Sequence, residues 1–457
     1  MALESRNPFD GSLIRLYEEH AHEEVEKILD SSATAFEGWS RTAFDQRAEI
    51  LRRAAGLLRE RNRDHAGLIA REMGKPVSQG RGEVEKCAWV CEYYAENAAS
   101  FLSPVNVATD AVCSQIVFRP IGPVLAVMPW NFPFWQVFRF AAPGLMAGNT
   151  VLLKHSSNVT GCALAIEEVF REAGLPDGCF RTLVLCSPRI PALIGDGRIA
   201  AVTLTGSTAA GRAVGEAAGS ALKKAVLELG GSDPYIVLED ADVEAAARIC
   251  VQSRLINSGQ SCIAAKRFIV HEDVYDGFRD MFVRGMRAAV VGDPMEEDTL
   301  VGPLARSDLR HELHSQVTRS LEMGASLVLG GTVPDGPGIF YPPTVLEHVS
   351  PEMPAFGEET FGPVAALSRA RDEREAIELA NGTAFGLGAA VFTRDVERGY
   401  RIASEELRAG CCFVNGFVRS DPRLPFGGVG QSGYGRELSE FGIREFVNTK
   451  TVSAYPG

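Results

Sequence analysis

The chain alternates between segments in which apolar residues recur at helical spacing and short runs that are almost wholly apolar. Residues 44–76 (FDQRAEILRRAAGLLRERNRDHAGLIAREMGKP) predict one long amphipathic helix that ends near Gly74 and Pro76. The runs GPVLAVMPW, NTVLLKHS, RTLVLC and IAAVTLTG follow, separated by helical patterns such as GCALAIEEVFREAG. Buried strands separated by helices indicate a parallel sheet with helices on both faces.

A second series of the same kind begins after LELGGSDPYIVLED, with the apolar runs KRFIVHE, ASLVLGG, FGPVAAL and AAVFT. Helical patterns again separate these runs, as in the first series. The sequence therefore predicts two doubly wound α/β domains in series, joined near Gly230 and Gly231.

Two segments fit neither series. Residues 102–120 (LSPVNVATDAVCSQIVFRP) predict a hairpin whose arms flank ATD, and the tail 441–455 (FGIREFVNTKTVSAY) is also typical of a strand. Strands that protrude from a domain have open edges, which invite pairing with another chain. We therefore expect these segments to make an oligomer contact.

Composition narrows the class of protein. The chain has 457 residues, which predicts two or three domains, and a formal net charge of −13, which argues against an extended nucleic-acid surface. The N-terminus is too acidic for a signal or transit peptide, and no apolar run approaches the length needed to span a membrane. We expect a cytoplasmic protein, or a mature unprocessed one. The ten cysteines show neither disulfide nor zinc spacing, so no metal site is predicted.

The segment VTLTGSTAAGRAVG is a candidate phosphate-binding turn. An apolar run ends at Gly206 and Ser207, and a helical pattern follows with Gly211 in its first turns. Backbone N–H groups at such a helix start bind phosphate, aided by the helix dipole. The spacing is not the full dinucleotide fingerprint, so an ordinary strand-to-helix turn is the alternative.

The segment VMPWNFPFWQVFRF carries Asn131, Trp135 and Arg139 at intervals of four residues. At 3.6 residues per turn, these three side chains lie broadly along one face of a helix. An amide donor, an aromatic wall and a guanidinium would then face one cavity. An amphipathic helix with a satisfied arginine is the alternative.

Glu228 and Cys262 are candidates for a base and a nucleophile. Glu228 ends an apolar run just before two glycines, where a carboxylate is either paired structurally or poised as a base. Cys262 lies in NSGQSCIAAKRF, whose small residues leave room for another group to approach the sulfur, although a tight loop would have the same composition. A cysteine thiol needs activation at neutral pH. Asn131, Glu228 and Cys262 together would supply an oxyanion donor, a base and a nucleophile. They occur in one chain with the candidate phosphate-binding turn.

These residues resemble the aldehyde dehydrogenase superfamily over essentially the whole chain. PWNFP, LTGSTAAG, LELGG, GQSC, EETFGPV and PFGGVGQSGYGRE occur in the order and at the spacing of that family. LLKH, GQSCIAAKRF and SDPRLPFGG are similar to strings of the bacterial succinate-semialdehyde dehydrogenase branch. The resemblance implies a Rossmann-like cofactor domain (1–101 and 121–229), a catalytic domain (230–435) and a β-strand oligomerisation element (102–120 and 436–457).

The resemblance also implies roles for individual residues. Cys262 would attack an aldehyde carbonyl, and the Asn131 amide and the Cys262 backbone N–H would hold the oxyanion. After hydride passes to a nicotinamide, Glu228 would activate the water that hydrolyses the thioester. The implied cofactor-binding residues are Trp130, Lys154, Ser157, Thr205, Gly206, Ser207, Gly211, Leu229, Gly230, Glu359 and Phe361.

One position departs from the pattern of relatives that prefer NAD. Those relatives often carry a glutamate three residues after the cofactor lysine, where this chain has Ser157 after Lys154. Without that carboxylate a 2′-phosphate is not repelled, and Lys154 can pair with it. We therefore hypothesise that NADP is accepted and preferred over NAD.

The implied substrate residues are Trp135, Arg139, Ser261 and Ser420. Arg139 would hold a distal carboxylate and Ser420 would help from the opposite wall, which suits succinic semialdehyde. A structural salt bridge is the alternative for Arg139, and a broad-specificity aldehyde dehydrogenase is then the alternative function. A non-catalytic protein on the same fold is the alternative from a different class. The expected assembly is a homodimer or a homotetramer.

Overall fold

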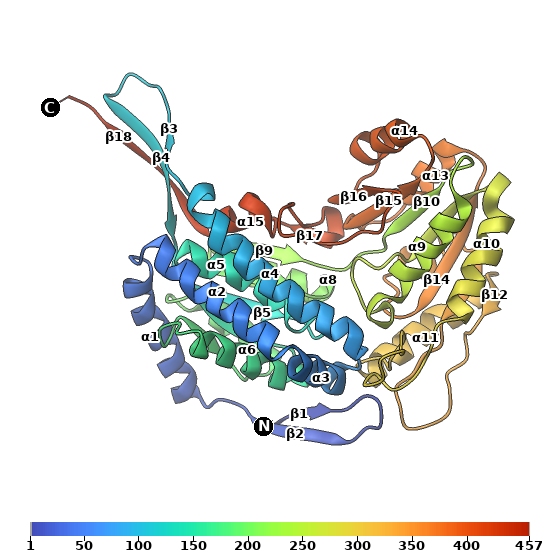
Figure 1. Cartoon of the computed structure of the whole chain (residues 1–457), viewed down its shortest axis with the longest axis horizontal. Helices are drawn as coiled ribbons and strands as arrows, with labels where there is room; N and C mark the ends of the chain where they lie inside the picture. Colours follow the sequence, from blue (N-terminus) through green and yellow to red (C-terminus); the bar gives the residue numbers. More distant parts are fainter. Residues whose placement is uncertain (1, 457) are drawn as a thin grey trace.

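The computed structural model describes residues 2–456 as two α/β units side by side, with a small three-stranded sheet that projects from one of them (Figure 1). Within these residues, no helix combines the length and apolar character needed to cross a membrane. Two parallel sheets in series confirm the fold predicted from the alternating apolar runs.

The first sheet has six strands, and five of them are parallel. The apolar runs of the first series form four of the strands, although RTLVLC contributes only its first two residues. The sixth strand pairs antiparallel with β9. In sheet order the strands are β17 (Gly433–Tyr434), β9 (Lys224–Glu228), β8 (Ala201–Thr205), β5 (Pro123–Met128), β6 (Thr150–His155) and β7 (Phe180–Thr182).

The segment 44–76 forms two helices and not the one that its periodicity predicts. Helical geometry is lost at Arg61, whose φ and ψ are −102° and 19°. The break lets both α2 and α3 pack against α4. The predicted end is confirmed, because Gly74 adopts the left-handed conformation (φ 78°) that stops a helix. The helices around this sheet are α1 (His22–Trp39), α2 (Phe44–Glu60), α3 (Asn62–Met73), α4 (Val77–Phe101), α5 (Trp135–Ala147), α6 (Thr160–Glu172), α7 (Ile190–Gly195) and α8 (Thr208–Ser220).

The second sheet has seven strands, of which only β12 is antiparallel to its neighbour. In sheet order they are β12 (Ser326–Leu329), β13 (Thr344–Glu347), β14 (Val364–Ala370), β11 (Arg267–His271), β10 (Pro234–Val237), β15 (Gly388–Phe392) and β16 (Cys411–Val414). The associated helices are α9 (Val243–Leu255), α10 (Glu272–Arg287), α11 (Ser307–Glu322), α12 (Pro354–Gly357), α13 (Glu373–Ala380) and α14 (Val396–Arg401).

The predicted hairpin and the C-terminal strand pair with each other in the projecting sheet, whose order is β18 (Val447–Ala454), β4 (Cys113–Pro120), β3 (Val105–Asn106). The tail is not a strand throughout, because residues 441–445 belong to α15 (Ser439–Glu445), which packs on α4 and α5. The chain also returns to the first sheet at β17, before residue 435, the predicted end of the catalytic domain. At the N-terminus, β1 (Ala2–Arg6) and β2 (Leu13–Glu18) form a separate antiparallel pair.

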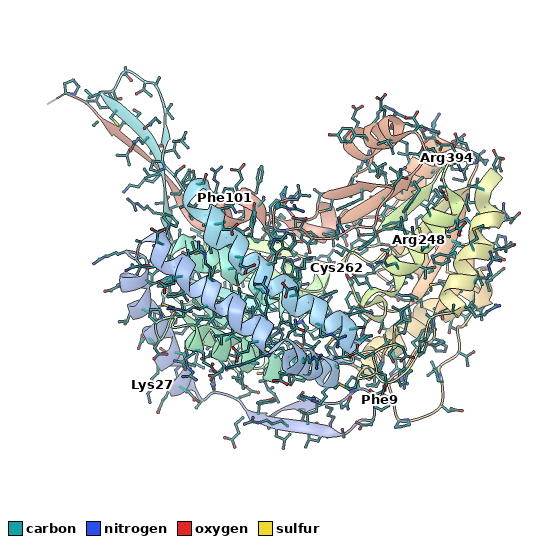
Figure 2. All side chains as sticks on the ribbon, in the orientation of Figure 1. Phe9, Lys27, Phe101, Arg248, Cys262 and Arg394 are labelled. Atoms are coloured by element: carbon teal, nitrogen blue, oxygen red, sulfur yellow. The ribbon has the colours of Figure 1, made fainter. Side chains whose placement is uncertain are left out.

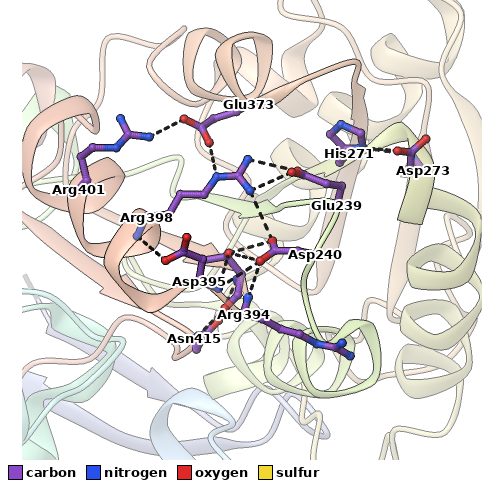
Figure 3. A network of polar contacts seen from close by, with 11 residues as sticks. Glu239, Asp240, His271, Asp273, Glu373, Arg394, Asp395, Arg398, Arg401 and Asn415 are labelled. Atoms are coloured by element: carbon purple, nitrogen blue, oxygen red, sulfur yellow. Dashed lines mark hydrogen bonds and ion pairs between the residues drawn. The ribbon is translucent and has the colours of Figure 1, made fainter.

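A network of ion pairs fixes α14 to α13 and to the turn after β10 (Figure 3). Arg398 contacts Glu239 at 2.8 Å and Glu373 at 2.5 Å, and Arg401 contacts Glu373 at 2.7 Å. Asp240 accepts hydrogen bonds from Thr393 and from the backbone N–H of Arg394. We call Glu239, Asp240, Glu373, Arg398 and Arg401 the Arg398 network.

Candidate active site

Cys262 lies between the two sheets, on the loop that joins a short 3₁₀ segment (Ile256–Gly259) to β11 (Figure 2). Three consecutive residues of that segment, Asn257, Ser258 and Gly259, have φ values of 52°, 56° and 76°. Gly259 also packs against the backbone carbonyl of Gly362, where a side chain would collide. The strained backbone turns the chain sharply just before the cysteine.

Side-chain amides hold this turn beside the Asn131 loop. Asn257 Nδ2 donates to the carbonyl oxygens of Asn131 (2.7 Å) and Gln260 (3.0 Å). Asn131 Nδ2 donates to the same Gln260 carbonyl at 3.2 Å, which leaves its second N–H for another acceptor. The Cys262 backbone N–H makes no hydrogen bond within residues 2–456. Two donors are therefore available beside the sulfur.

Lys266, near Cys262 in sequence, does not point at the sulfur. Its ammonium donates to the carbonyl oxygens of Ser261 (3.0 Å), Cys262 (2.6 Å) and Ala264 (3.1 Å), and so fixes the backbone of the cysteine loop. Burial raises the pKa of the Cys262 thiol to about 12, while the positive charges of Lys266 and Arg139 oppose that rise. The resting side chain is a thiol that must lose its proton when it reacts.

Glu228 is the last residue of β9 and is buried. Neither carboxylate oxygen has a hydrogen-bond partner among residues 2–456. Burial, followed by the charge of Glu437, raises the pKa of Glu228 well above its usual value. A Cβ on Gly427 would lie 2.7 Å from Glu228 Oε1, so the glycine leaves room for this carboxyl group. A raised pKa makes the carboxylate form a stronger base, which suits a proton acceptor.

Arg139 is buried on α5, where its guanidinium forms an ion pair with Glu437 and donates a 3.1 Å hydrogen bond to Thr205 Oγ1. It also lies over the ring of Phe426, 4.7 Å from the centroid. The sequence predicts a guanidinium that is free to bind a substrate carboxylate. In the structure, Glu437 already neutralises the charge of Arg139. We call Arg139, Glu228 and Glu437 the Arg139 cluster.

A cavity of about 740 Å³ opens onto Cys262 and Asn131. Most of the residues predicted to bind a cofactor line it: Trp130, Lys154, Thr205, Gly206, Ser207, Leu229, Gly230, Glu359 and Phe361. Other lining residues were not predicted from the sequence, among them Ser187, Arg306 and Gln316. No local pattern marks those three, because they lie outside the motifs and reach the cavity only through the tertiary fold.

Two predicted cofactor residues lie outside the lining. Gly211 faces Leu229, and a Cβ there would lie 2.5 Å from that side chain, so the glycine lets α8 pack on the sheet. Ser157 is exposed at the first position of a 3₁₀ turn, beside the lining residue Ser156. Its small, neutral side chain adds no negative charge beside Lys154.

The residues present suit a dinucleotide. Lys154 Nζ bonds only a hydroxyl, Ser187 Oγ at 3.2 Å, and no ion pair within residues 2–456 uses its charge. The N-terminus of α8, capped by Ser207, adds backbone N–H groups at the cavity wall. Glu359 accepts the backbone N–H of Gly231 at 2.9 Å and fills space that only a glycine at position 230 leaves open.

The four predicted substrate residues fall outside this cavity lining. Trp135 begins α5, and its backbone N–H donates to Glu83 at 3.0 Å. Ser261 is buried next to the cysteine, and Ser420 Oγ accepts a 2.7 Å hydrogen bond from Lys86. Lys86 is a residue that the sequence did not single out.

A cysteine and a side-chain amide at the edge of a dinucleotide-sized cavity, between two parallel sheets, are typical of oxidoreductases that form a thioester on the enzyme. Comparison with known proteins makes the class specific. The chain belongs to the aldehyde dehydrogenase family, whose model matches residues 1–452.

Named relatives cover nearly the whole chain. The chain is 48% identical over 448 residues to the succinate semialdehyde dehydrogenase NAD(P)+ Sad of Escherichia coli (strain K12), covering 98% of this chain and 97% of that protein. It is also 48% identical to succinate-semialdehyde dehydrogenase NADP(+) 1 of Mycobacterium tuberculosis (strain H37Rv), covering 99% of each. The crystal structure of succinic semialdehyde dehydrogenase from Streptococcus pyogenes with NADP+ superposes with a TM-score of 0.97, at 35% identity and full coverage of both chains.

Proposed function

We propose that this protein oxidises succinic semialdehyde to succinate with NADP as the preferred cofactor. The observation that carries the proposal is the placement of Cys262 and Asn131 on the wall of a cavity that also holds an unpaired Lys154. The named relatives support the same substrate and cofactor.

The first half of the reaction takes place at Cys262. Its sulfur adds to the aldehyde carbon, and the oxyanion that forms is stabilised by the free N–H of Asn131 and the backbone N–H of Cys262. Lys266 keeps the loop rigid while the thiol loses its proton. Bound nicotinamide supplies the chemistry that removes a hydride from the substrate carbon.

The second half requires water to attack the thioester on Cys262. Glu228 is the carboxyl group suited to accept a proton from that water, because burial raises its pKa and no hydrogen bond fixes its oxygens. This role requires the Glu228 side chain to rotate toward the sulfur of Cys262. Gly427 leaves room for the carboxyl group in its present position.

Lys154, Ser187 and the N-terminus of α8 would hold the cofactor phosphates, and Glu359 the nicotinamide ribose. Exposed Ser157 supports the preference for NADP. We predict that Ser157→Glu lowers kcat/KM with NADP by about 10- to 100-fold and leaves the value with NAD equal or higher, since a carboxylate would repel the 2′-phosphate. Steady-state kinetics with both cofactors measure this, and an unchanged ratio would refute the role of Ser157.

The substrate is tested by kcat/KM with NADP for succinic semialdehyde and for butyraldehyde, which has the same chain length without the carboxylate. A buried contact to the carboxylate is expected to favour the acid by about 100-fold, or about 2.7 kcal/mol. Equal values would support a broad-specificity aldehyde dehydrogenase. The ion pair of Arg139 with Glu437 is the observation that favours this second candidate.

The projecting sheet supports a homo-oligomer as a further proposal. Most of β18 is exposed, including Val452, and β3 presents an open edge on the other side of β4. The size of the assembly in solution, measured by light scattering with and without residues 446–457, tests this role. A homodimer or homotetramer that falls apart on truncation is the expected result.

A further inference from the structure

Lys86 lies where three distant parts of the chain meet. Its ammonium nitrogen donates a 2.7 Å hydrogen bond to Ser420 Oγ and lies 4.2 Å from the centre of the Trp135 ring. Lys86 belongs to α4, Trp135 begins α5, and Ser420 lies in the loop after β16. A cation, a hydroxyl group and an aromatic wall therefore come together next to the helix that follows Asn131.

The positive charge of Lys86 has no carboxylate of its own. Within residues 2–456, no ion pair of 4.0 Å or less includes Lys86. The acids around it have other partners, because Glu83 pairs with Lys75 and Asp421 pairs with Arg423. A partly buried cation without a counter-ion is costly, and an incoming anion would reduce that cost.

Arg139, the other cation nearby, differs in just this respect. Its guanidinium is neutralised by Glu437 and is also hydrogen-bonded to Thr205. A substrate carboxylate would have to break a buried ion pair to bind Arg139, whereas at Lys86 it would meet only a hydroxyl group. Lys86 is therefore better suited than Arg139 to bind a substrate carboxylate.

The contact with the Trp135 ring places Lys86 beside the start of α5. Trp135 is the first residue of α5 and comes four residues after Asn131, which precedes the helix. Glu83, one turn before Lys86 on α4, accepts the backbone N–H groups of Phe134 and Trp135 at 2.9 and 3.0 Å, which fixes α4 against this turn. The carboxylate of an extended four-carbon aldehyde acid lies about 5 Å from its carbonyl carbon, given C–C bonds of about 1.5 Å.

We infer that Lys86, with Ser420 beside it and Trp135 as a wall, binds the distal carboxylate of the substrate and sets the preference for acidic aldehydes. The inference rests on the proposed function, because only a substrate with a second, charged end requires such a ligand. Arg139 then has a different task, which is to stabilise the buried carboxylates behind the catalytic residues.

The electrostatic surroundings agree with this role. Burial lowers the pKa of Lys86 to about 8, with a further lowering by Arg139 that is opposed by Cys87, Asp421 and Glu83. Since kcat/KM reports the free enzyme, the preference for succinic semialdehyde over butyraldehyde is expected to decline as pH rises above about 8. A carboxylate bound beside the ammonium would restore a higher pKa.

The test is the ratio of kcat/KM for succinic semialdehyde to kcat/KM for butyraldehyde, measured with NADP on one preparation of each variant. This ratio does not depend on how much of the preparation is folded. Lys86→Met is expected to lower it by about 10- to 100-fold, mainly through a higher KM for the acid. Lys86→Arg is expected to keep most of the ratio, and Ser420→Ala to lower it by only a few-fold.

Lys27→Met is the matched control, because Lys27 is an exposed lysine on α1 far from Cys262 (Figure 2). Its ratio is expected to equal that of the unmodified protein. If the unmodified protein does not discriminate between the two aldehydes, the proposed function fails. If it discriminates and Lys86→Met retains the full ratio, the function stands and the inference about Lys86 is overturned.

Discussion

Two charged regions of the molecule are built on opposite principles. In the Arg398 network, each of the two arginines contacts more than one carboxylate, and the side chains keep part of their surface in water. In the Arg139 cluster, one guanidinium pairs with the buried Glu437, while the nearby buried Glu228 has no hydrogen-bond partner within residues 2–456.

The difference distinguishes ion pairs that stabilise the fold from charged groups that take part in catalysis. Ion pairs that keep contact with water contribute little individually and tolerate change. A buried set with more acid than base raises the pKa of its carboxyl groups, as at Glu228 and Glu437, and so makes their carboxylates stronger proton acceptors. The following substitutions would break or sharpen this contrast.

Glu228→Gln is expected to have the largest effect. It removes the base but keeps the shape, so kcat should fall by about 100- to 10,000-fold while a burst of NADPH close to one equivalent per site remains. Stopped-flow absorbance at 340 nm checks the burst. If the burst is lost as well as the steady-state turnover, Glu228 acts before the thioester forms. Because Glu228 has no hydrogen-bond partner and its raised pKa costs stability above about pH 4.3, the substitution should not lower the unfolding temperature at pH 7.

Arg139→Met should destabilise the protein by about 3 to 5 kcal/mol, because it leaves the buried Glu437 carboxylate without its cation. The double variant Arg139→Met/Glu437→Gln should recover most of that loss. Urea unfolding of both variants measures the difference. A stable single variant that has lost its preference for succinic semialdehyde would instead mean that Arg139 holds the substrate.

The raised pKa of Glu228 predicts a pH dependence of stability. In the unfolded chain this carboxyl ionises near pH 4.3, but in the folded protein it holds its proton to higher pH. Its stabilising contribution is complete below about pH 4.3 and is lost as pH rises through the folded pKa, by up to about 1.4 kcal/mol per pH unit. Glu228→Gln should therefore lose less stability than the unmodified protein as pH rises above about 4.3. Parallel unfolding curves would contradict this.

Arg398→Met should have the smallest effect. Its partners keep contact with water, so we expect a loss of about 1 kcal/mol or less and an unchanged kcat/KM. The same urea and steady-state assays check both values. A loss as large as that for Arg139→Met would remove the distinction between the two regions.

Much of this protein follows from its sequence. The apolar runs predict both parallel sheets because buried strands between helices have a recognisable pattern, and Gly74 ends its helix as expected. Motif order identifies the family, and Cys262 and Asn131 lie at one cavity as the combined motifs imply. The break at Arg61 escaped prediction because the helical periodicity continues across it.

Only the tertiary structure decides which charges are paired. Arg139 and Lys86 are both cations on helical segments, and nothing local distinguishes them. The first is neutralised by Glu437 from the C-terminal segment, while the second meets only Ser420. Sequence periodicity reports which face of an element is buried. The partner that a buried charge meets is set by distances between segments far apart in the chain, and these exist only once the sheets and helices have packed.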